Sequence, residues 1–440
     1  MNPTEYFSLQ DYSTHSLRQV AERAQAEWLL IQIAAGDIEL LPYGTERFVD
    51  VGRSTGAALI YSDYYIVDGE VDTQICNIDY QRGALRDDFD FGALVMLKTD
   101  IFKSIVARAT DDYTFAGWYD LRLRISEEAD IFHIAEPLYR VEQTSSDDAH
   151  SRHFAYIDKK NVDVQLDMER ACTAHLERIG GLLTTAPKKV DIDGGDFAVE
   201  ASVVIPVRNR EDTIADAVRS ALSQVADFEY NVVVVDNHST DRTGQIVEEL
   251  AKANAKVIRI TPESRHLGIG GCWQLAVDDT RCGRFAVQLD SDDVYQSPHT
   301  LQTIVDEFRR RRCAMVVGAY TITDFEMNPI APFLVDHREW TEKNGRNNAL
   351  RINGLGAPRA FYTPIVRQIK FPNVSYGEDY AMGLRICREW EIGRIYSSLY
   401  LCRRWGGNSD SGISRDTQNR YNFYKYKLRT IELISRINKK

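Results

Sequence analysis

The chain contains 440 residues, more than one ordinary domain usually holds, so two domains are expected. Hydrophobic residues make up 44% of it and aromatic residues 10%, a composition that excludes an intrinsically disordered chain. The 53 Lys and Arg residues against 65 Asp and Glu residues give a net charge of −12, which argues against nucleic acid and anionic membranes as partners.

The N-terminal sequence MNPTEYFSLQDYSTHS lacks the basic and apolar layout of a signal peptide. No apolar run approaches the roughly 18 residues that a membrane span needs. The seven cysteines are scattered and never have CxxC spacing, which is typical of free thiols and argues against a zinc site. We therefore expect a cytoplasmic protein with no transmembrane segment.

The first half of the chain resembles a later part of the second half. The segment LLIQIAAGDIELLP at 29–42 aligns with FAVQLDSDDVYQSP at 285–298, and two further pairs of segments align in the same order. These are LRLRI at 121–125 with MGLRI at 382–386, and PLYR at 137–140 with SLYL at 398–401. Three segments in one order favour an internal repeat over chance similarity.

The copy in the first half is incomplete. It has no counterpart of the apolar runs VVIPV and VVVVD that occur in the second half. It has also lost acidic residues: Ala34 and Gly36 replace Asp290 and Asp292, and Gly117 and Trp118 are in register with Glu378 and Asp379. We therefore expect residues 1–185 to form a partial domain that does no chemistry.

A polar, turn-rich stretch follows at 182–202, and we interpret residues 186–199 as a linker. Beyond it, apolar runs alternate with helical patterns, which predicts a parallel sheet with helices on both faces. The predicted strands are 201–207, 231–236, 256–260 and 284–289, and the predicted helices are 212–224, 239–253 and 270–279.

Carboxylates follow two of these predicted strands. Asp236 ends the run VVVVD, and the motif LDSDD places Asp290 and Asp292 after the run FAVQ. Ligands of open α/β sheets bind beyond the carboxyl ends of the strands. Two carboxylates one residue apart can bind Mg²⁺ or Mn²⁺ together with a ribose hydroxyl, although an acidic turn alone is usually just solvated.

Three further segments carry polar groups suited to a nucleotide and to proton transfer. A carboxylate at Asp236 can accept an N–H of a base, the glycines of SRHLGIGGCWQ allow backbone to approach a phosphate, and YGEDY pairs Glu378 with Asp379 as a general base and its neighbour. Each segment alone also fits a capped helix, a glycine turn or an acidic first helical turn.

Together these segments resemble family 2 glycosyltransferases, which are inverting enzymes of the GT-A fold. The resemblance covers roughly residues 200–410 and rests on VVIPVRNREDTI, VVVVDNHSTD, HLGIGGCWQLA, LDSDD and YGEDY in the family's order. It implies an α/β protein in which a GT-A (Rossmann-like) nucleotide-diphospho-sugar transferase domain at 200–440, ending in a helical tail, follows an incomplete GT-A-like domain.

The resemblance also implies site residues. Asp379 matches the catalytic base and Glu378 its neighbour, while Asp290 and Asp292 match the metal ligands. The implied nucleotide-sugar contacts are Pro206, Val207, Glu211, Asp236, Arg265, His266, Gly268, Asp290 and Arg404.

The chain departs from the family at two places. Asn237 and His238 replace the second Asp and the Gly of the common DDGSTD, which puts the details of base recognition in doubt. Many relatives complete the metal site with a late His, but no His follows His337, so a third metal ligand is not assigned.

The implied function is transfer of a sugar from a nucleotide-diphospho-sugar to an acceptor hydroxyl, with inversion and with Mn²⁺ or Mg²⁺, in glycan or polysaccharide biosynthesis. We expect a UDP-sugar ahead of a GDP-sugar, and the sequence is compatible with a homodimer. One alternative is a nucleotidyltransferase, although PVRNRED lacks the glycine-rich loop those enzymes carry after the first strand. The other is a non-catalytic carbohydrate-binding scaffold, which fits the first half better than the second.

Overall fold

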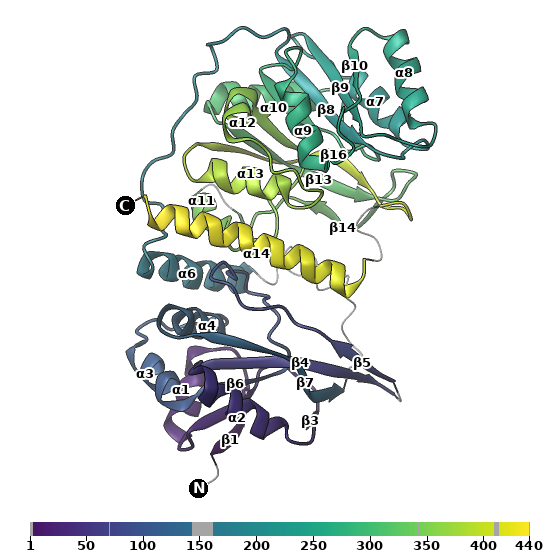
Figure 1. Ribbon diagram of the computed structural model, residues 1–440. Helices are drawn as coiled ribbons and strands as arrows, with labels where there is room; N and C mark the ends of the chain where they lie inside the picture. The colour runs from purple at the N-terminus through teal and green to yellow at the C-terminus, as the bar shows by residue number, and fades with distance from the viewer. Residues whose placement is uncertain (1–2, 70, 143–161, 341–342, 409–412, 440) are drawn as a thin grey trace. The chain divides into compact units, whose positions relative to one another are not determined.

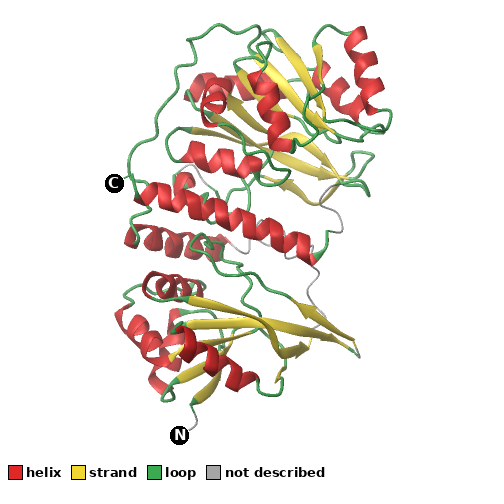
Figure 2. Cartoon of the chain, viewed as in Figure 1, coloured by secondary structure: helices red, strands yellow, loops and turns green. Residues whose placement is uncertain are grey.

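The computed structural model describes residues 3–69, 71–142, 162–340, 343–408 and 413–439, and it contains two compact units. Unit 1 comprises residues 1–182 together with 414–440, and unit 2 comprises residues 183–413 (Figure 1). Within the described ranges, every helix is too short or too polar to cross a membrane. Figure 2 shows that the strands of each unit form a twisted sheet flanked by helices.

Unit 2 contains a nine-stranded sheet in the order β10-β9-β8-β11-β15-β13-β16-β12, with β14 paired to β13. The strands are β8 (Ala201–Val207), β9 (Tyr230–Asp236), β10 (Val257–Ile260), β11 (Phe285–Gln288), β12 (Val294–Tyr295), β13 (Met315–Thr323), β14 (Pro329–Val335), β15 (Arg359–Tyr362) and β16 (Ile392–Arg403). The helices are α7 (Ile214–Leu222), α8 (Thr243–Ala253), α9 (Ile269–Asp278), α10 (Thr300–Arg311), α11 (Gly345–Asn348), α12 (Thr363–Ile369) and α13 (Glu378–Cys387).

The four strands β10, β9, β8 and β11 are parallel, as their alternation with helices predicts. Consecutive side chains of a strand point to opposite faces, and Val203, Val204 and Ile205 of β8 are all fully buried, so both faces of this part of the sheet are covered. Because the strands are parallel, their carboxyl ends meet at one edge: Val207 of β8 is in register with Asp236 of β9.

Unit 1 contains a seven-stranded sheet in the order β1-β2-β6-β4-β7-β3, with β5 paired to β4. The strands are β1 (Thr4–Ser8), β2 (Trp28–Gln32), β3 (Ile38–Leu40), β4 (Leu59–Asp68), β5 (Val71–Ile75), β6 (Leu94–Lys98) and β7 (Ile131–Glu142). The helices are α1 (Thr14–Arg23), α2 (Gly44–Thr55), α3 (Thr99–Arg108), α4 (Gly117–Glu128), α6 (Val162–Arg178) and α14 (Arg415–Ile437).

The two sheets have the same pairing scheme, which agrees with the expected repeat. In both units a parallel pair (β1–β2 or β8–β11) is followed by an antiparallel strand (β6 or β15), then by a parallel pair (β4–β7 or β13–β16), then by a short antiparallel strand (β3 or β12). In the described part of unit 1, no strand corresponds to β9 or β10.

The boundaries differ from the expected 1–185, 186–199 and 200–440. The expected linker packs on unit 2, because Val190 and Ile192 are buried and Lys188 forms a bridge with Trp390. The C-terminal helix α14, expected to follow the second domain, packs in unit 1: the ring of Tyr426 lies 5.4 Å from that of Phe89.

Gly83 packs directly against the backbone of α14. Its backbone N–H donates to Thr430 Oγ1 over 2.9 Å, and a Cβ at this position would collide with the backbone at Tyr426 and Thr430. We expect Gly83→Ala to lower the free energy of unfolding by roughly 1–3 kcal/mol, because backbone atoms cannot move aside as a flexible side chain would. Calorimetry measures the free energy and the midpoint of unfolding. Gly354→Ala is the control, because a Cβ at Gly354 would meet open space. Equal midpoints for both variants would contradict the tight docking.

Candidate functional site

The acidic motif after β11 lies at the carboxyl edge of the unit 2 sheet. Both carboxylate oxygens of Asp290 accept hydrogen bonds from Gln288 Nε2, at 2.9 and 3.0 Å. The backbone N–H of Asp290 donates to the hydroxyl of Tyr400 on β16, at 2.9 Å. These bonds fix Asp290 against the middle of the sheet.

The acids of this motif are poorly compensated by the protein. Burial raises the pKa of Asp290, although Arg359 opposes the rise, and burial together with the charges of Asp290 and Asp292 raises the pKa of Asp293 well above its usual range. A desolvated group of carboxylates gains stability from a cation placed beside it. The motif therefore has the electrostatics of a cation site.

The carboxylate of Asp292 faces the segment that follows β16. Its Oδ2 lies 3.4 Å from Trp405 Nε1 and 3.3 Å from Asn408 Nδ2, and its backbone carbonyl accepts a bond from Arg403 Nε at 2.5 Å. The sequence offers no late His to complete the metal site, and in the structure Trp405 and Asn408 lie beside Asp292. Arg404 is half-buried there, and its backbone N–H donates to the carbonyl of Thr323.

The described residues contain no group of three or more His, Cys, Asp and Glu that could hold a metal ion. Asp290 and Asp292 nevertheless fit a hard divalent cation that takes its remaining ligands from substrate phosphates and water. The fit rests on the two carboxylates and on the raised pKa of Asp290.

The paired acids Glu378 and Asp379 begin α13, after Gly377 in a left-handed conformation (φ 78°). Asp379 Oδ2 lies 2.7 Å from Arg359 Nη1, and both side chains are largely buried. Glu378 is 9% exposed, and its Oε2 has no hydrogen-bond partner among the residues that the structure describes. Burial and the neighbouring Asp379 raise the pKa of Glu378 to about 8.

The raised pKa of Glu378 makes stability depend on pH. Unfolded Glu378 releases its proton near the usual pKa of 4.5, whereas the folded chain keeps the proton up to about pH 8. The free energy of unfolding should therefore fall between these values as the pH rises, by at most about 1.4 kcal/mol per pH unit. We expect Glu378→Gln to flatten this slope in thermal unfolding at pH 5 to 8. Parallel curves for variant and wild type would contradict it.

At the end of β9, Asp236 bonds to other residues of unit 2 through both of its carboxylate oxygens. Asp236 is 2% exposed, its Oδ2 pairs with Arg259 Nη2 at 2.8 Å, and its Oδ1 accepts the N–H of Ser239 at 3.1 Å. Burial would raise the pKa of Asp236, but these bonds hold it below the usual value. Both oxygens of Asp236 are therefore engaged within the protein.

Asn237, the next residue, was noted in the sequence only as a departure. Its Nδ2 donates to the carbonyl of Leu267 at 2.9 Å, while its Oδ1 is buried and has no partner in the described parts of the chain. An unsatisfied buried acceptor is costly unless a ligand or water supplies a donor. Asn237 thus presents the unused acceptor at this strand end.

The other expected nucleotide contacts lie on the surrounding loops. Pro206 and Val207 end β8 beside Asp236, and Glu211 is exposed with its Oε2 accepting the N–H of Arg242 at 3.0 Å. Arg265 and His266 are exposed. Gly268 packs against the loop before α13: its N–H donates to Asn373 Oδ1 at 2.8 Å, and a Cβ would meet the backbone at Val374.

The corresponding positions of unit 1 hold a different arrangement. At the start of α4, Gly117 lies so close to the backbone of Ser13 and Thr14 that a Cβ there would collide with it. Asp120, the acid nearest this position, pairs with Arg124 Nε at 2.6 Å and with Arg178 Nη2 at 3.4 Å.

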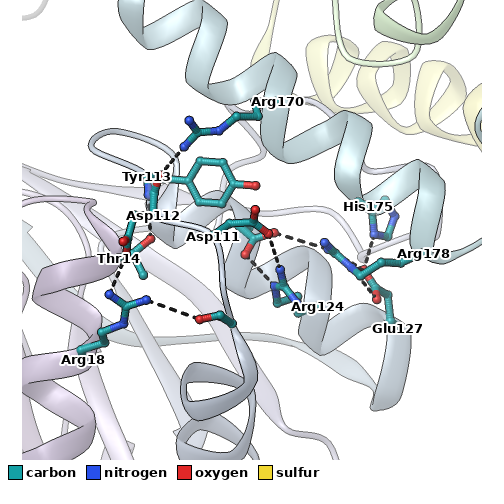
Figure 3. Close-up of polar contacts among 12 residues, drawn as sticks. Thr14, Arg18, Asp111, Asp112, Tyr113, Arg124, Glu127, Arg170, His175 and Arg178 are labelled. Carbon is teal, nitrogen blue, oxygen red and sulfur yellow. Dashed lines mark hydrogen bonds and ion pairs between the residues drawn. The ribbon is translucent and has the colours of Figure 1, made fainter.

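Figure 3 shows the ion pairs that connect α4 with its neighbours. Arg124 Nη2 also lies 3.2 Å from Asp111 Oδ2. Glu127 Oε1 lies 2.8 Å from Arg178 Nη2 and 2.7 Å from His175 Nδ1. The acids of this cluster are thus engaged by cations on α4 and α6.

Sequence comparison matches residues 202–365 to the family described as Glycosyl transferase family 2. TuaG of Bacillus subtilis, named for teichuronic acid biosynthesis, is 24% identical over 189 residues, which are 43% of this chain and 72% of TuaG. The poly(ribitol-phosphate) β-N-acetylglucosaminyltransferase TarS of Staphylococcus aureus is 39% identical over 105 residues, and chondroitin synthase of Escherichia coli is 36% identical over 110. These matches cover 23% and 25% of this chain but only 17% of TarS and 15% of chondroitin synthase.

Two solved structures are also similar. S. aureus TarS 1–349 in complex with UDP-GlcNAc aligns at 22% identity and a TM-score of 0.42, covering 53% of this chain and 66% of that one. The mannosyltransferase PcManGT of Pyrobaculum calidifontis, in complex with GDP-Man and Mn²⁺, aligns at 16% identity and a TM-score of 0.40, covering 60% and 73%. Both TM-scores lie below 0.5, whereas the match to the family model extends over residues 202–365.

Proposed function

We propose that the chain is a family 2 glycosyltransferase of the GT-A fold, and that it moves a sugar from a nucleotide-diphospho-sugar to an acceptor hydroxyl with inversion at the anomeric carbon. The match of residues 202–365 to that family supports the proposal. The observation that supports this most directly is the Arg359–Asp379 pair. It joins α13 to the strand β15, which pairs with β11, the strand that leads to Asp290 and Asp292. A base and a cation site are thereby connected through one part of the sheet.

In this proposal Asp290 and Asp292 would hold Mn²⁺ or Mg²⁺, which would supply positive charge that stabilises the leaving diphosphate. Asp379 accepts the proton of the acceptor hydroxyl, whose oxygen bonds to the anomeric carbon from the face opposite the leaving group. The bond from that carbon to the diphosphate oxygen breaks, and the nucleoside diphosphate leaves with the electron pair. One displacement through an oxocarbenium-like transition state inverts the configuration.

We assign the base contact to Asn237 rather than to Asp236. The buried Oδ1 of Asn237 lacks a partner in the described chain, whereas Arg259 and Ser239 engage Asp236. A carbonyl oxygen can accept the N3–H of uracil or the N1–H of guanine. Pro206, Val207, Glu211, Arg265, His266 and Gly268 remain proposed as the surroundings of the nucleotide, and Arg404 as a cation near the diphosphate.

We propose that unit 1 does no chemistry and binds no nucleotide. Gly117 leaves no room for a side chain where unit 2 has Glu378, and the nearby Asp120 is paired with two arginines. The described part of unit 1 also has no strands in place of β9 and β10, and β9 is the strand that leads to the proposed base contact Asn237 in unit 2.

A thermal-shift screen of the full chain tests the proposed function. UDP-GlcNAc, UDP-glucose, UDP-galactose and GDP-mannose are each added with and without Mn²⁺. One donor should raise the unfolding midpoint, more with Mn²⁺, because a ligand that binds only the folded state stabilises it by mass action. Turnover should release a nucleoside diphosphate. Release of pyrophosphate would instead indicate a nucleotidyltransferase, and no shift or turnover with any donor would contradict the proposal for this panel.

A further inference from the structure

Arg359 is a cation inside the acidic part of the unit 2 site, and no motif in the sequence marked it. Its side chain is 18% exposed, and its Nη1 lies 2.7 Å from Asp379 Oδ2 and 2.8 Å from the carbonyl of Gly356. Its backbone N–H donates to Gln288 Oε1 at 3.0 Å, and the amide of the same Gln288 bonds to Asp290. Arg359 therefore contacts the proposed base directly and the proposed metal ligand through one residue.

The charges around Arg359 are almost all negative. Burial lowers the pKa of Arg359, but attraction to Asp379, Asp290 and Glu378 outweighs burial and raises it. An arginine presents a planar set of N–H donors that can hold a carboxylate in one orientation, which a flexible ammonium does less well. Arg359 thus has both the charge and the shape to fix Asp379.

The repeat supplies an internal comparison for this residue. The pair Leu59–Ile131 begins β4–β7 as Met315–Ile392 begins β13–β16, so Tyr61 corresponds to Val317. Tyr61 pairs with Val95 on β6, and Val317 pairs with Arg359 on β15.

By this register unit 1 has the buried Val95 at the position of Arg359, and the register of β2–β6 against that of β11–β15 gives the buried Leu94, so the counterpart is apolar in either case. The same sheet position is filled without a cation where Gly117 and Trp118 replace the two acids. The sheet itself does not require an arginine at this position. The arginine is present in the unit that has the two acids and absent from the unit that lacks them.

We propose that Arg359 is a positioning residue that holds the carboxylate of Asp379 in one orientation for proton transfer from the acceptor. The proposal rests on the proposed function, because it requires Asp379 to be the base. It assigns Arg359 no contact with donor or acceptor.

A double-mutant cycle tests this role in the full chain. Arg359→Gln, Asp379→Asn and the double variant are compared with wild type by kcat and donor KM, from release of UDP from UDP-GlcNAc or of GDP from GDP-mannose. We expect Arg359→Gln to lower kcat by roughly 10- to 10²-fold, because a misplaced catalytic group costs about that much. The donor KM should change by less than about twofold. In the Asp379→Asn background the same change should cost less than about twofold, because the group it positions is already gone.

Two further variants separate positioning from general loss of structure. Arg359→Lys keeps the charge and should recover part of kcat. Arg367→Gln is the matched control. Arg367 is a partly buried arginine on the adjacent α12 that donates to the carbonyls of Val277 and Asp279, and its loss should change kcat by less than about twofold.

The outcomes are distinguishable. An equal loss of kcat from Arg359→Gln in both backgrounds would overturn the positioning role, and so would a rise in donor KM with kcat unchanged. Full activity of Asp379→Asn would instead overturn the assignment of the base, and with it the proposed mechanism. If neither donor reacts, the cycle is measured on thermal unfolding midpoints, where additive effects would overturn the pairing of Arg359 with Asp379.

Discussion

Replacing Asp379 with Asn should lower turnover by roughly 10²-fold or more while donor binding persists. The variant keeps the size of the side chain but removes the proton acceptor, so the acceptor hydroxyl must attack without help. The loss should appear in kcat, with little change in the thermal shift produced by the donor. Because Asp379 begins α13 and pairs with Arg359, the unfolding midpoint of the variant must be measured alongside its activity.

Asp278→Asn is a suitable control for this variant. Asp278 lies in the same unit, at the end of α9, and pairs with Lys370 at 2.9 Å. Its loss removes an ion pair without touching the proposed site. Equal losses of donor affinity and turnover in Asp379→Asn would indicate a structural role for Asp379, and unchanged turnover would exclude it as the base.

Asp292→Asn should abolish metal-stimulated turnover and leave the fold intact. The substitution removes one of two proposed ligand carboxylates, and an amide oxygen is a weaker ligand for Mg²⁺ or Mn²⁺. Treatment of the wild-type chain with EDTA should have the same effect and should be reversed by adding Mn²⁺. The Mn²⁺-dependent part of the donor thermal shift should disappear in the variant.

Calorimetric titration with Mn²⁺ in the presence of UDP checks the same site without turnover. Asp306→Asn is the matched control, because Asp306 is an exposed acid on α10 that pairs with Arg309 at 3.5 Å. Full activity and an unchanged Mn²⁺ titration in Asp292→Asn would remove Asp292 from the metal site.

The parts of the fold that the sequence predicts well are those that local patterns specify. The buried β-branched runs of β8 and β9 and the apolar faces of the helices between them gave strands and helices close to the observed bounds. Local patterns also predict Asp290, Asp292, Glu378 and Asp379 as site residues, because each follows a recognisable strand or begins a helix, and their roles stay predictions.

Arg359 could not be found in this way, because its role depends on tertiary pairing. The strand β15 is short, and its insertion between β11 and β13 is what brings Arg359 to Asp379. Asp236 and Asn237 illustrate a second limit, because both stand at a strand end. Tertiary contacts with Arg259 and Ser239 engage Asp236, whereas Oδ1 of Asn237 has no partner among the described residues. The position of α14 illustrates a third, because helical periodicity shows which face is apolar and not which unit it covers.

The return of α14 to unit 1 has a consequence for synthesis on the ribosome. Domains usually fold as they emerge, the N-terminal one first. Here the residues that complete the N-terminal unit, among them the buried Tyr426 and Leu433, lie after the whole of unit 2. Residues 1–182 must therefore wait with part of their apolar surface uncovered while unit 2 is made. Unit 2 is therefore the first unit that can complete its fold during synthesis. Until residues 414–440 are made, the N-terminal segment of unit 1 is the part of the chain that most needs protection from aggregation.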